Sequence, residues 1–424
     1  MLSLQFIREN ADRVKRDVLL RNTTAPVDRI LQLDEERRAI LQQVEALRAK
    51  RNTVSKAIGA TKDAADREVR IVEMRLVGDE IERLDTGLNK IEAELKEKLY
   101  EVPNILDPDV PKGPDETSNQ LVEVVGDLPR FPFAPRPHWE LGEIVGGLDI
   151  ERGAKMSGSR FYTLRGPLAK LQRALIQFML NEHGRAGFTE AYLPYMLTEA
   201  SLYAAGQLPK FRDNLYRDFE EDYYFIPTAE VAFVNLYRDE IIPAGQLPMR
   251  FVGHTPCFRR EKMSAGRDVR GIKRGHQFEK VEMFVYCEPE QSEAELEALV
   301  ARARSIPEIL GLPYRVLALC SGDIGFNSTK TFDLEIWAPG QGEWLEVSSA
   351  SNCLDFQAWR ANIRYRPGGE QGVRHPHMLN ASGLALPRTV IAVMENYQRE
   401  DGSIEVPEAL QPYMGMDVIP AVTG

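Results

Sequence analysis

The sequence predicts an α+β protein, in which a long antiparallel helical hairpin precedes a domain built on a mixed, mainly antiparallel β-sheet flanked by helices. Two segments of heptad-spaced apolar residues near the N-terminus indicate the hairpin. A proline-rich stretch separates it from the rest of the chain. Beyond that stretch, helical patterns alternate irregularly with short β-rich runs, and no G-x-G-x-x-G or P-loop motif occurs, which disfavours a doubly wound parallel sheet.

Length and composition are ordinary for a soluble globular protein with two domains: 424 residues, of which 43% are hydrophobic and 28% charged. No apolar run is long enough to span a bilayer. The net charge of -11 means that any contact with a nucleic acid must come from local basic patches. The four cysteines are scattered without a CxxC pair, which argues against a zinc site and for a reducing cytoplasm.

Residues 1–102 are expected to form the N-terminal domain, with the hairpin over about 27–100. Apolar residues recur in alternating steps of three and four from Ile30 to Ile58 and again from Met74 to Leu95. Residues 59–66 interrupt the pattern and are the expected turn. Between residues 48 and 75, eight Lys or Arg stand against four Asp or Glu, so this part of the hairpin carries a local charge of +4. Such charges usually serve solvation, but on a projecting arm they also suit an RNA phosphate backbone.

Prolines mark a linker over residues 103–115, and the second domain is expected over 116–424. Within it we expect an amphipathic helix from Pro167 to Gly184, followed by a strand from Gly187 to Pro194. Two further helices are expected over residues 290–309 and 384–398.

The segment from Pro256 to Phe284 predicts a strand, a long basic loop and a second strand. Arg259 and Glu261 are two residues apart and are expected to share a face. One parity on the second strand collects Arg274, His276, Phe278, Lys280 and Glu282. Arginine grips phosphate or carboxylate and an aromatic ring stacks on a base, so this face suits a nucleotide together with a second small charged ligand. An ordinary charged hairpin with a solvated outer face is the alternative.

The connecting loop runs from Lys262 to Lys273 and carries an excess of positive charge. It holds four basic residues against one acidic one, namely Lys262, Arg267, Arg270 and Lys273 against Asp268. We expect it to reach for a polyanion outside the pocket.

This segment resembles motif 2 of the class II aminoacyl-tRNA synthetases, and in detail that of the seryl-tRNA synthetase family, bacterial type. Three further segments agree: Ile226–Glu230 resembles the family's TxE segment, Glu346–Asn352 its second ATP segment, and Leu379–Arg388 its motif 3. The helix and strand over residues 167–194 resemble motif 1, which forms the dimer interface in this class. The resemblance runs nearly end to end and implies a class II synthetase catalytic domain behind a coiled-coil arm.

The resemblance implies a serine–tRNA ligase, a cytoplasmic homodimer that depends on ATP and Mg²⁺. Such an enzyme activates L-serine with ATP to seryl-adenylate and transfers the seryl group to the 3′ end of tRNA(Ser), with tRNA(Sec) as a further candidate. The alternative is a synthetase paralogue that forms an aminoacyl-adenylate but transfers it to a non-tRNA acceptor. A third alternative is a coiled-coil interaction protein with a degenerate site.

The resemblance also implies roles for individual residues. Arg259 bridges the serine carboxylate and the α-phosphate, and Arg388 reaches the γ-phosphate; these two are the catalytic candidates. Glu261 accepts from the adenine amino group, while Phe278 stacks on the purine. The full ATP-binding set is Arg259, Arg260, Glu261, Arg274, Phe278, Glu346, Val347, Ser348, Ser349 and Arg388. The serine-binding set is Thr228, Ala229, Glu230, Arg259, Glu282 and Ser382.

Metal and tRNA contacts follow from the same resemblance. Glu346 and Ser349 are expected to hold Mg²⁺, although simple strand alternation would put Glu346 and Ser348 on one face and Ser349 on the other. Either a bulge or a strand end occurs there, or Ser348 is the inward hydroxyl. Besides the motif 2 loop, the expected tRNA contacts lie on the arm, at Arg48, Arg51, Lys56, Lys62, Arg67 and Arg70.

The sequence departs from the family pattern at a few positions near these motifs. Lys262-Met263 stand where Ala-Gly is common in the family, Ala381 stands where glycine is usual, and Pro387 stands where glycine is often found. Ala381 is expected to narrow the serine pocket slightly.

Overall fold

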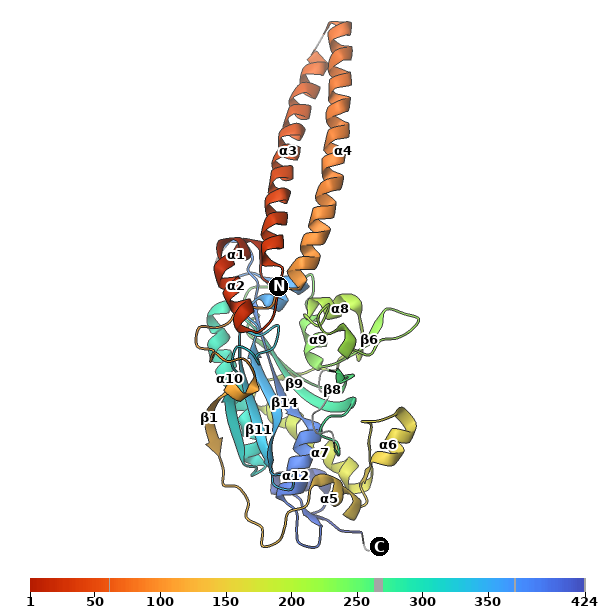
Figure 1. The fold of residues 1–424 in the computed structure, drawn as a ribbon, viewed down its shortest axis with the longest axis vertical. Coiled ribbons are helices and arrows are strands. Elements are labelled where there is room, and N and C mark those ends of the chain that lie inside the picture. The colour runs from red at the N-terminus through yellow and green to blue at the C-terminus, as the bar shows by residue number, and fades with distance from the viewer. Residues whose placement is uncertain (61, 263–269, 370, 423–424) are drawn as a thin grey trace. The chain divides into compact units, whose positions relative to one another are not determined.

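The computed structural model describes residues 1–60, 62–262, 270–369 and 371–422, and the chain divides into two compact units (Figure 1). The first comprises Leu2–Leu19 and Thr23–Pro103, and we refer to it as the arm unit. The second comprises Met1, Leu20–Asn22 and Asn104–Gly424, and we refer to it as the catalytic unit. The boundary in the main body of the chain thus falls between Pro103 and Asn104.

The arm unit contains the predicted antiparallel hairpin. After α1 (Leu4–Glu9) and α2 (Ala11–Leu20), helices α3 (Val27–Ala60) and α4 (Ala64–Tyr100) run side by side in red and orange (Figure 1). Their seam buries heptad residues on both helices, namely Val44, Met74, Val77, Ile81 and Leu84. The predicted turn over residues 59–66 is partly helical, since α3 extends to Ala60 and α4 begins at Ala64. The Asp63 side chain caps α4 at this early position by accepting hydrogen bonds from the backbone N–H groups of Ala65 and Asp66.

The catalytic unit is built on an eight-stranded sheet in which every neighbouring pair is antiparallel except β4 and β8. In spatial order its strands are β1 (Gln120–Val125), β10 (Tyr314–Ala318), β11 (Lys330–Ala338), β12 (Glu343–Asn352), β14 (His377–Ala385), β9 (Gln277–Cys287), β8 (Met249–Phe258) and β4 (Thr189–Glu190). Four two-stranded pairs complete the strands: β2 (Leu148–Asp149) with β3 (Thr163–Leu164), β5 (Met196–Thr198) with β6 (Tyr223–Phe225), β7 (Ile241–Ile242) with β13 (Arg364–Tyr365), and β15 (Ile404–Glu405) with β16 (Val418–Ile419).

Helices pack on both faces of the large sheet. The α-helices of the catalytic unit in the described part of the chain are α5 (His138–Ile144), α6 (Ile150–Ser157), α7 (Gly166–Arg185), α8 (Glu199–Ala204), α9 (Ala229–Val234), α10 (Ser292–Ile309), α11 (Phe356–Ala361), α12 (Leu386–Asn396) and α13 (Gln411–Met414). The predicted helices over 167–184, 290–309 and 384–398 correspond to α7, α10 and α12. The expected strand over 187–194 shrinks to the two residues of β4, the only ones there that pair with β8 in the described part of the chain.

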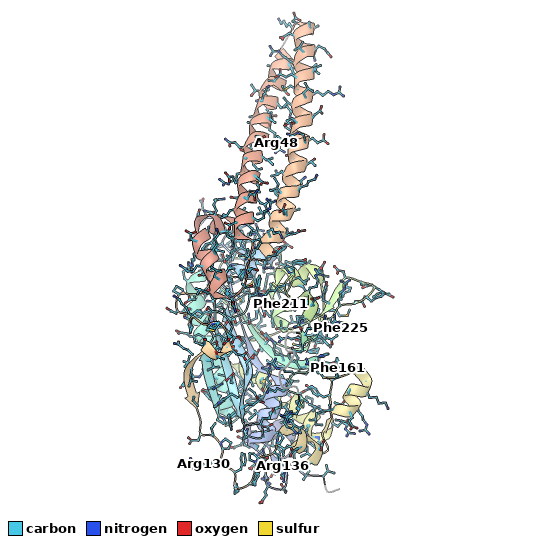
Figure 2. The ribbon with its side chains drawn as sticks, in the orientation of Figure 1. Arg48, Arg130, Arg136, Phe161, Phe211 and Phe225 are labelled. Atoms are coloured by element: carbon cyan, nitrogen blue, oxygen red, sulfur yellow. The ribbon has the colours of Figure 1, made fainter. Side chains whose placement is uncertain are left out.

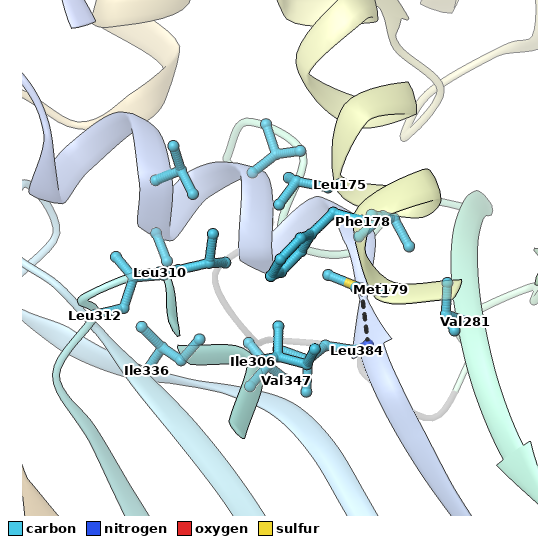
Figure 3. Packing of buried hydrophobic residues seen from close by; sticks show 14 of the residues in the cluster. Leu175, Phe178, Met179, Val281, Ile306, Leu310, Leu312, Ile336, Val347 and Leu384 are labelled. Carbon is cyan, nitrogen blue, oxygen red and sulfur yellow. Dashed lines mark hydrogen bonds between the residues drawn. The ribbon is translucent and has the colours of Figure 1, made fainter. Parts of the chain in front are cut away.

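One face of the sheet is apolar and packs against α7, α10 and α12. Alternate residues of each central strand point into this core, such as Val281 on β9, Ile336 on β11 and Val347 on β12. Figure 3 shows them meeting Leu175 and Phe178 of α7. The period-2 geometry of a strand then forces the intervening residues of the same strands onto the opposite face.

The opposite face is only partly covered. Near β8, β9 and β14, a second apolar cluster includes Phe284, Tyr286 and Met378 and packs under α8, α9 and α11. Beyond this cluster the same face carries polar side chains and is open as a cavity. The fold thus places one polar face of a well-packed sheet at the floor of a site.

Two simple properties accompany this fold. The free thiols of Cys257, Cys287, Cys320 and Cys353 are all buried. Among the described residues, no helix combines the length and the apolar character needed to cross a bilayer.

Candidate active site

The open face of the sheet forms a cavity of about 370 Å³ that collects most of the predicted site residues. They come from the ends of β8, from β9, β12 and β14, from the start of α12 and from the segment before α9. The predicted residues that line it are Thr228, Glu230, Arg259, Glu261, Arg274, Phe278, Glu282, Glu346, Val347, Ser349, Ser382 and Arg388. Phe211, labelled in Figure 2, also lines it.

The alternation of β9 explains part of this assembly. Phe278, Lys280 and Glu282 have one parity and all line the cavity, as their spacing predicts. The predicted strand pair is nevertheless shorter than expected, since β8 ends at Phe258 and β9 begins at Gln277. His276 therefore does not follow the parity: its Nδ1 lies 2.7 Å from the Tyr216 hydroxyl, and it does not line the cavity.

One end of the cavity is rich in buried polar groups. Lys280 forms an ion pair with Glu282 and donates a 2.7 Å hydrogen bond to Thr228 Oγ1. Thr228 is the N-cap of α9, where its hydroxyl accepts from the Glu230 backbone N–H. Ser382 on β14 lies directly opposite Glu282 on β9, so cross-strand pairing brings a hydroxyl and a carboxylate together.

Glu230 has a perturbed carboxyl group at this end. Desolvation, and after it the nearby negative charge of Glu282, raise its pKa to about 7. Opposing these effects, Lys280 and Arg259 contribute positive charge and Gln357 donates a hydrogen bond to Glu230 Oε1. A cationic ligand beside Glu230 and Glu282 would relieve the repulsion between the two carboxyl groups.

The other end combines arginines with an aromatic ring. The Arg259 guanidinium lies 5.2 Å from the centre of the Phe278 ring, and its Nε donates to the Pro227 carbonyl at 3.1 Å. Arg388 is at the start of α12, where it donates to the Glu346 carbonyl and lies 3.3 Å from the Glu346 carboxylate. Arginine planes beside an aromatic ring can hold a base and its phosphates.

A β-bulge determines which serine of the second ATP segment reaches the cavity. Along β11 and β12, Leu334 pairs with Ser348 but the next residue, Glu335, pairs with Glu346, so Val347 is the extra residue. The bulge restores Glu346 and Ser349 to the same face, and both line the cavity. Ser348 points to the core side and donates to the Ser382 carbonyl at 2.6 Å.

Two other predicted residues lie outside the cavity lining. Ala229 is fully buried in the cluster under α8 and α9. Arg260 is directed elsewhere, with its guanidinium 5.8 Å from the Tyr216 ring.

Ala381, the departure expected to narrow the pocket, is buried in the apolar core on the far face, whereas Pro387 lines the cavity. From the motif 2 loop, Lys273 also lines the cavity, whereas Arg267 and Asp268 fall outside the described residues.

The structure adds site residues that were not assigned from the sequence. Lys280, Asn380 and Gln357 contact or line the end of the cavity that holds Glu230 and Glu282, and Asp333 pairs across the strands with Ser349. Burial and the negative charge of Glu346 hold the pKa of Asp333 well above its usual range. Strand parity was the available signal, since Asp333 and Glu335 alternate with the core residues Leu334 and Ile336.

On the arm, the six predicted tRNA-contacting residues fall into two groups. Arg48 pairs with Asp85 across the hairpin (Arg48 is labelled in Figure 2), and Arg70 pairs with Asp66 within α4. The others, Arg51, Lys56, Lys62 and Arg67, are exposed and form no ion pair with any described residue. Their charge is therefore available to an external polyanion.

Comparisons with known proteins agree with this arrangement. A family model described as "Seryl-tRNA synthetase N-terminal domain" matches residues 1–106, and one described as "tRNA synthetase class II core domain (G, H, P, S and T)" matches residues 211–397. The serine–tRNA ligase of Roseiflexus sp. (strain RS-1) is 56% identical over 418 residues, which cover 98% of each chain. That of Dehalococcoides mccartyi (strain CBDB1) is 53% identical over 420 residues, covering 99% of this chain and 100% of that protein.

Solved structures give the same result. The seryl-tRNA synthetase from Pyrococcus horikoshii, complexed with ATP, matches with a TM-score of 0.94 and 36% identity over 100% of both chains. The cytoplasmic serine–tRNA ligase from Naegleria fowleri, complexed with AMP, matches with a TM-score of 0.89 and 29% identity over 100% of this chain and 99% of that one. A further match, the M. kandleri SerRS in complex with A. aeolicus tRNASec, is 18% identical with a TM-score of 0.60 and supports the fold alone.

The antiparallel sheet and the cavity on its open face, together with the core-domain match, define a class II aminoacyl-tRNA synthetase. Within that class, the match of the arm and the whole-length relatives decide the group. The chain belongs to the seryl-tRNA synthetase family.

The raised pKa of Glu230 predicts how serine binding depends on pH. An ammonium group binds the ionised carboxylate, and below a pKa of about 7 this form becomes scarcer by about tenfold per pH unit. We therefore expect the KM for serine in ATP–pyrophosphate exchange to fall as the pH rises toward about 7, and then to level off. Glu230→Gln should raise this KM and flatten its pH dependence; a profile that Glu230→Gln leaves unchanged would assign the titration to another group.

Proposed function

We propose that this chain is a serine–tRNA ligase, which forms seryl-adenylate from serine and ATP and then esterifies tRNA(Ser). One observation carries the proposal: a single cavity joins two carboxylates suited to an ammonium group with arginines and an aromatic ring suited to a nucleotide. Neither chemical step requires a protein nucleophile, because positioning of the substrates and neutralisation of their charges lower the activation barrier.

Arg259 stands between the two ends of the cavity and is proposed to bridge the serine carboxylate and the α-phosphate. The serine ammonium then lies beside Glu230 and Glu282, and its hydroxyl reaches Glu282 or Ser382. A carboxylate oxygen attacks the α-phosphorus, a new O–P bond forms, and pyrophosphate leaves with the electrons of the broken bond. Holding both anions against one guanidinium removes their repulsion and much of the entropic barrier.

At the other end, Phe278 and Arg388 are proposed to sandwich the adenine, with Glu261 accepting from its amino group and Arg274 contacting phosphate. The oxygen-only set of Glu346 and Ser349 fits Mg²⁺, and the neighbouring Asp333 Oδ1 is buried without a hydrogen-bond partner among the described residues. When bound, Mg²⁺ supplies positive charge at the phosphates. No group of three or more His, Cys, Asp or Glu within the described ranges is arranged to hold a metal by itself, which suits an ion shared with a triphosphate.

Transfer is proposed to use the arm and the motif 2 loop, which bring the tRNA 3′ hydroxyl to the acyl carbon. The exposed basic residues of the arm support contact with the phosphates of tRNA(Ser), and tRNA(Sec) is a further proposed substrate. We also propose a homodimer through the motif 1 elements and a cytoplasmic location, which the four free thiols support.

Serine-dependent ATP–pyrophosphate exchange, followed by transfer to purified tRNA(Ser), tests the function. Exchange with transfer supports the ligase. Exchange without transfer favours the paralogue that passes its adenylate to a non-tRNA acceptor, although a basic-tipped arm has no evident use in such an enzyme. No exchange with any amino acid contradicts both.

The bulge at Val347 gives a matched pair of serine variants. Ser349→Ala removes a hydroxyl from the proposed metal site, so we expect the Mg²⁺ concentration for half-maximal exchange to rise about tenfold, the cost of one such contact. Ser348→Ala removes the hydrogen bond to the Ser382 carbonyl, so it should lower the melting temperature and leave the Mg²⁺ dependence unchanged. The reverse outcome would make Ser348 the hydroxyl that faces the metal.

The arm also supplies its own controls. Replacing Arg51 and Arg67 by Ala removes charges that form no ion pair with a described residue, so transfer to tRNA(Ser) should weaken and the slope of log affinity against log salt should become shallower by about 2. Replacing the paired Arg48 and Arg70 should have a smaller effect on both. Serine-dependent exchange should stay unchanged in each variant. Equal effects of the two pairs would contradict the assignment of the free charges to tRNA.

A further inference from the structure

The C-terminal base of the motif 2 loop, residues 270–274, is held by groups that lie outside the motifs. Lys273 and Arg274 line the cavity, and Lys273 forms an ion pair with Glu343. Just before them, the Arg270 guanidinium lies 5.0 Å from the centre of the Trp139 ring. The path of this short segment therefore decides where two cationic side chains meet the nucleotide end of the site.

A further contact comes from His138, the first residue of α5. Its Nε2 accepts a 3.1 Å hydrogen bond from the backbone N–H of Ile272, and both residues are essentially inaccessible to solvent. Gly271 has a φ of 68°, and a Cβ added there would lie 1.8 Å from His138 Nε2. The loop backbone is thus pressed against the imidazole at a position that a larger residue cannot occupy.

The hydrogen bonds fix the tautomer of His138. The Ile272 N–H can only donate, so Nε2 must carry the lone pair and the ring proton must be on Nδ1. Nδ1 lies 3.1 Å from Glu395 Oε1, which also accepts from the His138 backbone N–H at 2.9 Å. The other oxygen of Glu395 accepts from the backbone N–H groups of Gly340 and Gln341. With only donors around it, fully buried Glu395 acts as a carboxylate acceptor.

Glu395 also links this contact to the rest of the nucleotide end. It lies on α12, whose first turn presents Arg388 to the cavity. One short helix therefore carries an arginine of the site and, near its other end, the carboxylate that orients His138. Through Ile272, the same carboxylate sets the base of the loop that bears Arg274.

From this chain of contacts we infer that Glu395 and His138 are a positioning pair for the nucleotide end of the cavity. Neither side chain lines the cavity; they act by holding the Ile272 N–H and with it Lys273 and Arg274. The inference rests on the proposed function in one respect, the contact of Arg274 with phosphate. It assigns the pair to ATP affinity and leaves the serine end untouched.

Two variants of His138 distinguish the role of its hydrogen bond to Ile272 from the role of the ring in filling space. His138→Phe keeps a flat ring and removes the acceptor, so the KM for ATP in pyrophosphate exchange should rise about tenfold, while the KM for serine stays within about twofold. His138→Gln keeps an acceptor within reach of Ile272 and should restore most of the ATP affinity. His375→Phe is the control, because the His375 ring also hydrogen-bonds the backbone, with its Nδ1 donating to the Ile363 carbonyl, but it lines no part of the cavity.

A substitution in the loop itself tests the same contact independently. Gly271→Ala pushes the backbone away from His138 and should reproduce the selective rise in the KM for ATP, which keeps the inference testable if His138→Phe does not fold. An equal rise in both KM values, an effect of His138→Gln as large as that of His138→Phe, or an unchanged KM for ATP in folded His138→Phe would overturn it. Arg274→Ala, measured in parallel, reports separately on the proposed phosphate contact.

Discussion

Alternation along the strands of one antiparallel sheet is the constraint on which the rest of the catalytic unit depends. Each central strand presents apolar residues to α7, α10 and α12, and the alternate residues that reach the cavity on the opposite face are mostly polar. Burial of the first set fixes the register, because a slip by one residue would exchange the faces. The hydrophobic core beneath the cavity thus holds the polar side chains of the site in place.

Within that constraint, the bulge residue Val347 decides which side chains of β12 face the cavity. Without the bulge at Val347, Glu346 would share a face with Ser348, and Ser349 would be turned into the core. Cross-strand pairing also sets Asp333 beside Ser349, and Ser382 beside Glu282. These pairs come from strands far apart in the sequence, so the site is a property of the register as much as of the motifs.

The same physics explains what the sequence could reveal. The arm is predictable because a heptad seam is local, and Phe278, Lys280 and Glu282 are predictable because they lie on one strand. Strand parity gave the wrong position for His276 because β9 begins only at the next residue, Gln277. Parity could not decide whether Ser348 or Ser349 faces the cavity, because a bulge has no local signature in the sequence. The hold of His138 on Ile272 joins residues 134 positions apart, a separation at which spacing gives no signal.

The distribution of charge in the cavity leaves unfavourable electrostatic interactions at both ends, which bound ligands of the opposite charge would relieve. At one end, burial and Glu282 disfavour ionisation of Glu230; at the other, burial and Glu346 disfavour ionisation of Asp333. A cation at either end would therefore lower the electrostatic repulsion, and under the proposed function it is the serine ammonium group in the first case and a metal in the second. The arginines between them have the opposite demand, for carboxylate and phosphate. Because each substrate brings charges that relieve those of the protein, the order of charges along the cavity, rather than any one residue, sets the orientation in which serine and ATP meet.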